Sequence, residues 1–356
     1  MHKLNTKKIA VVDLFCGAGG LTHGLKNEGM KIRGGFDLDA TCKFAYEENN
    51  NAPFIEKDIN NVNGKEVLEL YKKSDIKVLA GCAPCQPFSQ YTQGTDSKHD
   101  KKWGALYQFS RIVRDTLPDI VTMENVPQLI KHDVYDDFVS DLKKLGYFVR
   151  ANIVFCPNYG IPQSRRRLVL LASKFGEIEL IPETHNKENY NTVISTIGHL
   201  EPISQGGGCK SDPLHTSSGL SQNNLERIKA SKPGGSWLDW NEDLVANCHK
   251  KKGRETYIGV YGRMSWDKPS PTMTTQFISF GSGRFGHPEQ NRAISLREGA
   301  LLQTFPEGYK FSPPNKRVVL KNVARMIGNA VPVDLGRVIA KSIKVHVFNH
   351  KNKIWF

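Results

Sequence analysis

The sequence lacks long hydrophobic runs and has few cysteines, and both absences exclude classes of protein. No apolar segment approaches the ~18 residues of a membrane-spanning helix, so we expect no membrane contact. The first eight residues lead directly into Ile9–Phe15, without the apolar region and cleavage site of a signal peptide. The seven cysteines, odd in number, spread from Cys16 to Cys248, which argues against a disulfide framework and favours the reducing cytoplasm.

Acidic residues are scarce as well. The 356 residues include 49 Lys and Arg against 36 Asp and Glu, a net charge of +13. This excess suits a polyanionic partner, but it also occurs in proteins without one, so charge alone does not assign a nucleic acid. Most of the excess lies in residues 291–356.

The first half of the sequence alternates segments typical of strands and of helices. Helical spacing predicts helices at Gly19–Glu28 and Ala40–Asn49, and another that carries Leu106 to Leu117 and stops at Pro118. Apolar runs predict strands at Ile9–Leu14, Ile32–Asp37, Phe54–Asp58, Ile76–Gly81, Asp119–Met123, Phe148–Phe155 and Leu168–Ala172. Such alternation predicts an α/β fold with a mixed, mostly parallel sheet covered on both faces.

The composition changes after about Lys174. Residues 185–290 are rich in Gly, Ser, Asn and Pro with weak periodicity, which predicts a smaller, loop-rich, partly β domain. Helical patterns return from Leu296. We therefore expect a main domain of residues 1–185 plus 326–356, a second domain of residues 186–295, and a hinge segment at 296–325.

The first chemical motif is Asp13-Leu14-Phe15-Cys16-Gly17-Ala18-Gly19-Gly20, which closes a strand and opens a helix. Glycines let a ligand approach the backbone, and a helix N-terminus can meet it. The G-x-G-G spacing differs from the G-x-G-x-x-G of dinucleotide binders. Asp37 and Asp58 end the next two strands, where acids can hold a ribose or meet an adenine edge. The motif predicts a nucleotide-like ligand, and the alternative is a tight turn with solvated acids.

The second motif, Gly81–Ser89, contains Cys82-Ala-Pro-Cys85 at a strand end. It is open to several interpretations: half a zinc site, a redox dithiol, a single nucleophilic thiolate at Cys85 with Pro84 shaping the turn, or a buried structural cysteine. No second C-x-x-C or His pair lies nearby, which disfavours zinc.

Two further motifs carry charged groups. Glu124-Asn-Val-Pro127 places a carboxyl at a strand end, where it can donate a proton to a ring nitrogen or simply be solvated. In Gln163–Leu170, Arg165 and Arg167 are expected to share one face of a strand. Paired guanidiniums suit carbonyl oxygens and phosphates, and the alternative is a basic edge that deters strand pairing.

Taken together and in this order, the motifs resemble those of the DNA (cytosine-5) methyltransferase family, over nearly the whole chain. The Arg292–Pro306 stretch and Gly328–Val333 complete the set. The resemblance implies a Rossmann-like methyltransferase fold and S-adenosylmethionine as methyl donor. Phe15 would lie against the adenine and Asp37 on the ribose. Residues that match the cofactor pocket are Asp13, Phe15, Gly17, Gly19, Asp37, Leu38, Asp58, Ile59, Pro84, Asn329 and Val331.

The resemblance also implies the catalytic roles. Cys85 would attack C6 of a flipped-out cytosine, Glu124 would donate to N3, and Arg167 would hold O2. Arg165 would poise the thiolate or a phosphate, and Cys82 would be incidental. The segment Gln86–Trp103 matches a loop that closes over the flipped base. Within it, Gln86 and Ser89 are expected to contact the substrate, Ser89 through a phosphate.

Residues 186–295 correspond to the family's variable target-recognition region. The candidates for reading bases are Arg263, Pro269–Thr275 and Arg284, because Arg can reach guanine O6 and N7. The basic run Lys250–Arg254 suits phosphates. The expected partners are double-stranded DNA and a separately acting restriction endonuclease, and we expect a monomer. The alternatives are a tRNA cytosine-5 methyltransferase of the same family, a C-x-x-C redox enzyme and a catalytically silent DNA-binding module.

Overall fold

The computed structural model describes residues 8–73, 75–84, 104–247, 249–250 and 258–353. The chain forms two compact units. The first comprises Met1–Phe155, Arg166–Glu183 and Val333–Phe356, and the second comprises Cys156–Arg165 and Thr184–Pro332. Among the described helices, none is long and apolar enough to cross a membrane.

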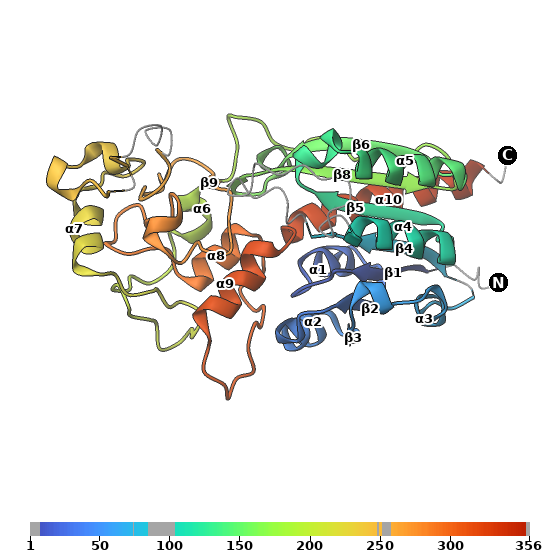
Figure 1. Cartoon of the computed structure of the whole chain (residues 1–356), viewed down its shortest axis with the longest axis horizontal. Helices are drawn as coiled ribbons and strands as arrows, with labels where there is room; N and C mark the ends of the chain where they lie inside the picture. Colours follow the sequence, from blue (N-terminus) through green and yellow to red (C-terminus); the bar gives the residue numbers. More distant parts are fainter. Residues whose placement is uncertain (1–7, 74, 85–103, 248, 251–257, 354–356) are drawn as a thin grey trace. The chain divides into compact units, whose positions relative to one another are not determined.

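The first unit is built on a seven-stranded sheet (Figure 1). Its order is β3-β2-β1-β4-β5-β8-β6, in which the first five strands run parallel and β8 is antiparallel to both of its neighbours. The mixed, mostly parallel sheet predicted from the alternating pattern is therefore confirmed. The strands are β1 (Ile9–Leu14), β2 (Lys31–Asp37), β3 (Phe54–Glu56), β4 (Ile76–Gly81), β5 (Ile120–Asn125), β6 (Phe148–Phe155) and β8 (Arg166–Ser173).

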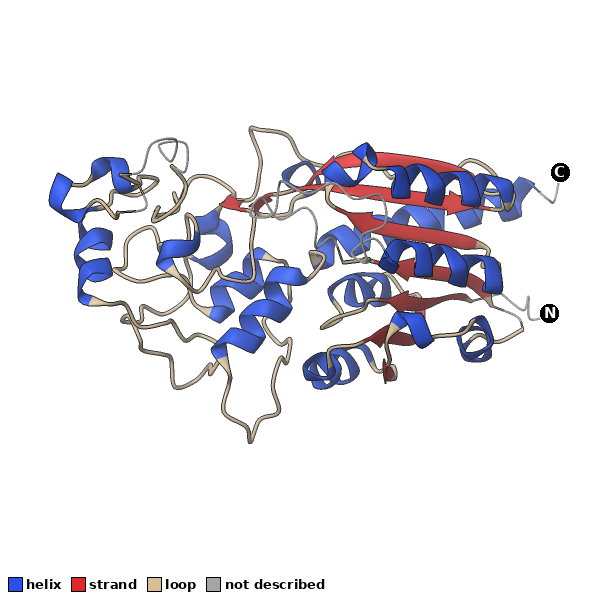
Figure 2. Ribbon diagram, in the orientation of Figure 1, coloured by secondary structure: helices blue, strands red, loops and turns tan. Residues whose placement is uncertain are grey.

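Helices cover both faces of this sheet (Figure 2). On one face α3 (Gly64–Leu70), α4 (Gly104–Thr116) and α5 (Asp133–Lys144) pack side by side, and they enclose the core around Phe109 and Phe138. On the other face, α1 contacts both α2 and α10. These three helices are α1 (Gly20–Asn27), α2 (Lys43–Asn50) and α10 (Val333–Lys353).

The contact between α1 and α10 depends on glycine at both sides. A Cβ on Gly24 would lie 2.7 Å from the backbone nitrogen of Arg337, and one on Gly336 would lie 2.8 Å from the carbonyl oxygen of Leu21. No side chain fits at such distances, so the two glycines let the helix backbones approach each other.

One predicted helical position is wrong. Leu117 continues the apolar spacing of α4, yet the helix ends at Thr116, and Leu117 is exposed with a left-handed φ of 42°. The cause is Pro118, whose ring disfavours helical backbone in the residue before it.

The second unit consists mostly of loops with short helices. Its described strands are the two-residue β7 (Gln163–Ser164) and β9 (Ser270–Pro271), which pair in parallel. The described part of this unit therefore contains little of the β structure that the sequence predicted. Its helices are α6 (Val193–Ile197), α7 (Gln222–Ala230), α8 (Leu296–Leu302) and α9 (Leu320–Asn329).

The bounds of the two units differ from the predicted domains. Residues 296–325, predicted as a hinge, and residues 326–332 belong to the second unit, as do residues 156–165. Hydrogen bonds explain this assignment, because Arg297 N donates to the carbonyl of Leu214 and the side-chain amide of Gln303 donates to the carbonyls of Ile327 and Ala330. The segment is therefore bonded into the second unit.

Candidate active site

Four strands of the first unit end at one edge of its sheet. Because β1, β2, β4 and β5 run parallel, their carboxyl ends meet there. Phe15, Asp37, Cys82 and Glu124 lie at or directly beside these ends. Open α/β sheets bind their ligands at this edge. The structure thus brings the glycine motif and the Glu124 motif to the same side of the sheet.

The glycine motif forms a turn with an open backbone. Phe15, Gly17 and Gly19 have left-handed φ values of 60°, 50° and 88°, a conformation that is strained for Phe15. A Cβ on Gly17 would meet no atom within 4 Å. Helix α1 begins at Gly20 without a side-chain cap, so no capping side chain competes with a ligand for its first backbone N–H groups. The turn therefore suits a ligand that approaches the backbone with a polar or negative group.

Asp37 and Leu38 extend this surface. The carboxylate of Asp37 accepts hydrogen bonds from Gly17 N and Asp39 N, both at 2.8 Å, and its burial raises its pKa above the ordinary value. Leu38, directly after it, is 67% exposed. A carboxylate beside an exposed apolar side chain suits a nucleoside, since one can take ribose hydroxyls and the other can cover an apolar ring face.

Three predicted cofactor residues have mainly local contacts. The carboxyl of Asp13 is buried and accepts a hydrogen bond from Thr22 Oγ1 on α1. Burial, with a smaller effect of the Asp37 charge, raises the pKa of Asp13 to about 7. Asp58 caps the short helix that begins at Ile59 by accepting from Asn60 N, and Ile59 packs half-buried against the core.

The other predicted cofactor residues, Pro84, Asn329 and Val331, are distant in sequence from the glycine motif. Pro84 is exposed and is the last described residue before the gap at 85–103. Asn329 ends α9 and is exposed, whereas Val331 is buried. Both belong to the second unit, so their place in the cofactor pocket stays a prediction.

Glu124 is held at both carboxylate oxygens. Its side chain is only 3% exposed. Arg167 Nε lies 2.9 Å from Oε1, and the Cys82 thiol donates a hydrogen bond to Oε2 at 2.8 Å. Arg167 reaches Glu124 because β8 pairs with β5. The structure therefore brings two of the predicted catalytic residues into contact and adds Cys82, which the sequence interpretation had treated as incidental.

The prediction that Arg165 and Arg167 share one face of a strand is wrong. Strand β7 ends at Ser164 and β8 begins at Arg166, so Arg165 lies between them and belongs to the second unit. It is buried, and its Nη1 donates to Met273 O at 3.0 Å and Gln163 Oε1 at 3.2 Å. A tight backbone hydrogen bond from Arg165 N to Gln163 O breaks the extended run.

Several predicted site residues lie outside the described part of the chain. These are the nucleophile candidate Cys85, the predicted closing loop Gln86–Trp103 with Gln86 and Ser89, and residues 251–254 of the basic run. Their roles rest on the sequence motifs and remain predictions.

Arg263 is not available to read a base, which corrects the prediction. It is only 4% exposed, and all three of its guanidinium nitrogens donate within the second unit. The acceptors are the carbonyls of Ile228, Ser231, His287 and Gln290, and the side chain of Asn291. A guanidinium has five N–H donors, and these bonds engage them, so Arg263 joins loops of the unit.

Arg284 is engaged only in part. It is half-buried, and its Nη1 donates to the carbonyls of Gly234 and Gly235. Within the described part of the chain, the hydrogen bonds of the Arg284 guanidinium all come from Nη1 and none from Nε or Nη2. Its base-reading role stays a prediction.

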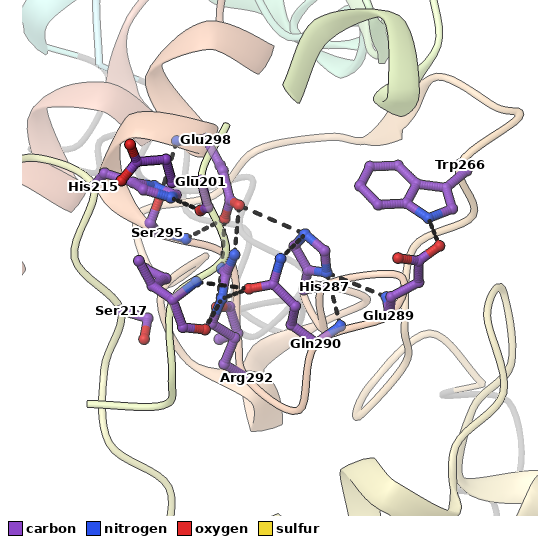
Figure 3. Close-up of polar contacts among 12 residues, drawn as sticks. Glu201, His215, Ser217, Trp266, His287, Glu289, Gln290, Arg292, Ser295 and Glu298 are labelled. Carbon is purple, nitrogen blue, oxygen red and sulfur yellow. Dashed lines mark hydrogen bonds and ion pairs between the residues drawn. The ribbon is translucent and has the colours of Figure 1, made fainter. Parts of the chain in front are cut away.

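A buried polar network organises the second unit around Arg292 and Glu298 (Figure 3). Two guanidinium nitrogens of Arg292 lie 2.7 Å from the two carboxylate oxygens of Glu298, and both side chains are almost fully buried. Ser295 caps α8 in a capping box with Glu298, and its hydroxyl contacts His215 at 2.9 Å. Burial lowers the pKa of the adjacent His287 to about 4.

The sequence interpretation did not identify this network, although one signal was present. Ser295-x-x-Glu298 before an apolar run is a capping-box pattern. The partners His215 and His287 are distant in sequence, and no local pattern indicates them.

The comparisons with known proteins place these motifs in a family. The family model of C-5 cytosine-specific DNA methylases matches residues 9–345. The chain belongs to this family. As a member of it, the chain is a DNA methyltransferase that requires a methyl donor.

Individual relatives agree with the family. The type II methylase M.HgiDII of Herpetosiphon aurantiacus is 55% identical over 338 residues, which cover 94% of this chain and 95% of the relative. The type II methyltransferase M1.BsuMI of Bacillus subtilis is 32% identical, over 95% of this chain and 81% of the relative.

Solved structures share the fold. A DNA modification methyltransferase encoded within an Escherichia coli prophage superposes with a TM-score of 0.71 at 19% identity, covering 96% of this chain and 99% of that one. The Entamoeba histolytica methyltransferase EhMeth superposes with a TM-score of 0.65 at 16% identity, over 96% of this chain and 99% of that one. The predicted methyltransferase fold is confirmed.

Proposed function

We propose that this member of the family methylates C5 of a flipped-out cytosine in a specific sequence of double-stranded DNA, through a covalent adduct with Cys85. The observation that carries the proposal is the Glu124 carboxylate, buried and fixed by Arg167 at a strand end of the sheet. An adjacent parallel strand, β4, leads directly into the Pro84-Cys85 motif.

S-adenosylmethionine fits the residues of the glycine motif as the methyl donor. The open backbone at Gly17 and the uncapped start of α1 suit a carboxylate-bearing ligand, and Asp37 with Leu38 suits a nucleoside. When bound there, the donor would supply an electrophilic methyl group. Phe15, Asp37 and Leu38 would bind its adenosine, and the turn at Gly17 and Gly19 would leave room for its methionine part.

The protein's own groups perform the activation of cytosine. C5 is a poor nucleophile, and addition of the Cys85 thiolate to C6 makes C5 nucleophilic as in an enamine. In its protonated form, Glu124 donates a hydrogen bond or its proton to N3 and so offsets the negative charge that builds on the ring. Arg167 fixes this carboxyl and has N–H groups for O2. After methylation, loss of the C5 proton lets the Cys85–C6 bond break.

The reaction requires the base to leave the duplex. Neither face of a stacked cytosine is open to a thiolate, so extrusion, which costs a few kcal/mol, must precede addition. We assign target recognition to residues 186–295, with Arg284 as the base-reading candidate. The type II names of the relatives support a modification enzyme that acts beside a separate endonuclease, and we propose that it acts as a monomer.

Trapping the adduct tests this function. Duplex DNA of mixed sequence that contains 5-fluorocytosine has no C5 proton to lose, so the Cys85–C6 bond cannot break after methyl transfer. With S-adenosylmethionine, we expect a protein–DNA species that survives denaturation and whose crosslinked peptide contains Cys85. Cys85→Ser should abolish it and Cys209→Ser should not. A stable species that persists in Cys85→Ser would contradict the proposal.

A further inference from the structure

The Cys82 thiol contacts the carboxylate that the reaction depends on. Cys82 follows β4 directly, and β4 pairs in parallel with β5, which carries Glu124. This pairing places Sγ 2.8 Å from Oε2 of Glu124. Cys82 is partly buried and Glu124 is buried, so the contact is largely shielded from water.

The thiol acts as a hydrogen-bond donor. Burial, the Glu124 charge and the hydrogen bond to Glu124 raise the pKa of Cys82 well above its ordinary value, and the smaller opposing effect of Arg167 does not reverse this. The group therefore keeps its proton at neutral pH. A neutral thiol is a poor nucleophile and a poor redox partner, which argues against the dithiol interpretation of Cys82-x-x-Cys85.

Two groups contact different oxygens of Glu124, Arg167 through an ion pair and Cys82 through a hydrogen bond. Arg167 Nε faces Oε1, and the Cys82 S–H faces Oε2. The last torsion of a glutamate side chain is broad, so one contact leaves the carboxyl plane free to turn. Two contacts on opposite oxygens fix the plane. Asn125, the residue after Glu124, is also held in place, because its side-chain amide donates a hydrogen bond to the carbonyl of Ala83 at 3.1 Å.

We propose that Cys82 is a positioning residue for Glu124, donating its S–H to Oε2 and so orienting the carboxyl toward the cytosine ring. The proposal rests on the proposed function of Glu124. Cys82 itself makes no bond to the substrate, so its effect belongs in the chemical step and not in binding.

Kinetics of two substitutions test the role. Cys82→Ala removes the donor, whereas Cys82→Ser keeps an O–H in its place. We expect Cys82→Ala to lower kcat about 10-fold, as for loss of a hydrogen bond to a charged group, with KM for DNA and for S-adenosylmethionine changed less than about 2-fold. Cys82→Ser should recover most of kcat. An unchanged kcat in Cys82→Ala, or equal losses in both variants, would overturn the proposal.

Alkylation gives a readout that does not depend on activity. Burial and the Glu124 charge together raise the pKa of Cys82, and Glu124→Gln removes the charge, so iodoacetamide at alkaline pH should label the Cys82 peptide faster, as followed by mass spectrometry. The matched variant Glu56→Gln alters an exposed glutamate and should leave the rate unchanged. Equal labelling in Glu124→Gln and the unaltered protein would overturn the contact. If the unaltered protein methylated no DNA, the proposed function would fail instead, and the labelling would still decide the contact.

Discussion

Arg167 Nε lies 2.9 Å from Oε1 of Glu124, and both side chains are largely removed from water. The pair forms because β8 runs antiparallel to β5 and returns its first residues to the carboxyl end of β5. A carboxylate fixed in this way has lost its conformational freedom before a substrate arrives, which is how a positioned acid lowers an activation barrier.

Glu124→Gln should nearly abolish methyl transfer. The amide keeps the shape of the carboxyl but cannot transfer a proton to N3, and general acid catalysis contributes about 10²–10⁴-fold to a rate. We expect a loss of that order in kcat, measured as transfer of a labelled methyl group to DNA. The exposed Glu56→Gln is the matched control. A Glu124→Gln variant within about 3-fold of the unaltered protein would refute the role.

Asp37→Ala should weaken binding of S-adenosylmethionine. The carboxylate accepts from Gly17 N and Asp39 N, and it is the acid placed to meet the ribose. We expect the dissociation constant to rise about 10-fold or more, as for a lost hydrogen bond to a charged group, by isothermal titration calorimetry. Asp136→Ala, at an exposed position on α5, should bind normally. Unchanged affinity in Asp37→Ala would remove Asp37 from the pocket.

The pH dependence of stability should carry the signature of Asp13. Its folded pKa of about 7 lies above the unfolded value, so the folded state holds a proton that the unfolded state releases. The protonation of Asp13 therefore makes its full contribution to the free energy of unfolding below pH ~4, and this contribution is lost progressively as the pH rises toward about 7. Asp13→Asn keeps an acceptor for Thr22 but has no charge to bury.

Urea denaturation of Asp13→Asn from pH 4 to 8 measures this effect. The free energy of unfolding of Asp13→Asn relative to the unaltered protein should increase across pH 4 to 7 and then level off. Asp136→Asn should show no such trend. A difference that is constant with pH would contradict the account of Asp13.

Arg292→Met should strongly destabilise the second unit. The change leaves the Glu298 carboxylate buried without its bidentate partner, and breaking a buried pair in this way costs about 3–5 kcal/mol. Adding Glu298→Leu should recover part of that loss, since no charge is then buried. Urea denaturation compares the two variants. A single substitution that costs less than about 1 kcal/mol would show that the pair is not structural.

The sequence predicted the sheet and its functional edge well, because both follow from local signals. Alternating patterns locate strands, and residues at the ends of parallel strands must meet at one edge. Asp37 and Glu124 could be assigned to that edge for this reason alone. The contact between Cys82 and Glu124 was not predicted, because the spacing of Cys82 to Cys85 in the sequence says nothing about the strand beside it.

Two of the failed predictions, those for Arg165 and Arg263, concern long-range contacts. Arg165 and Arg263 look like free cations in the sequence, but most of their acceptors are backbone carbonyls, among them those of Met273, Ile228 and His287. Carbonyls leave no trace in residue identity, so only the fold shows that these guanidiniums are used structurally. The buried pair of Arg292 and Glu298 was not predicted either, although the capping box of Ser295 and Glu298 was visible in the sequence.

Mass spectrometry of nucleosides from duplex DNA and from tRNA, each incubated with the protein and S-adenosylmethionine, tests whether the enzyme methylates C5 of cytosine in DNA. We expect 5-methylcytosine in the duplex DNA, none above background in the tRNA, and none in either with Cys85→Ser. Methylation of tRNA alone, or 5-methylcytosine formed equally by Cys85→Ser, would contradict this expectation.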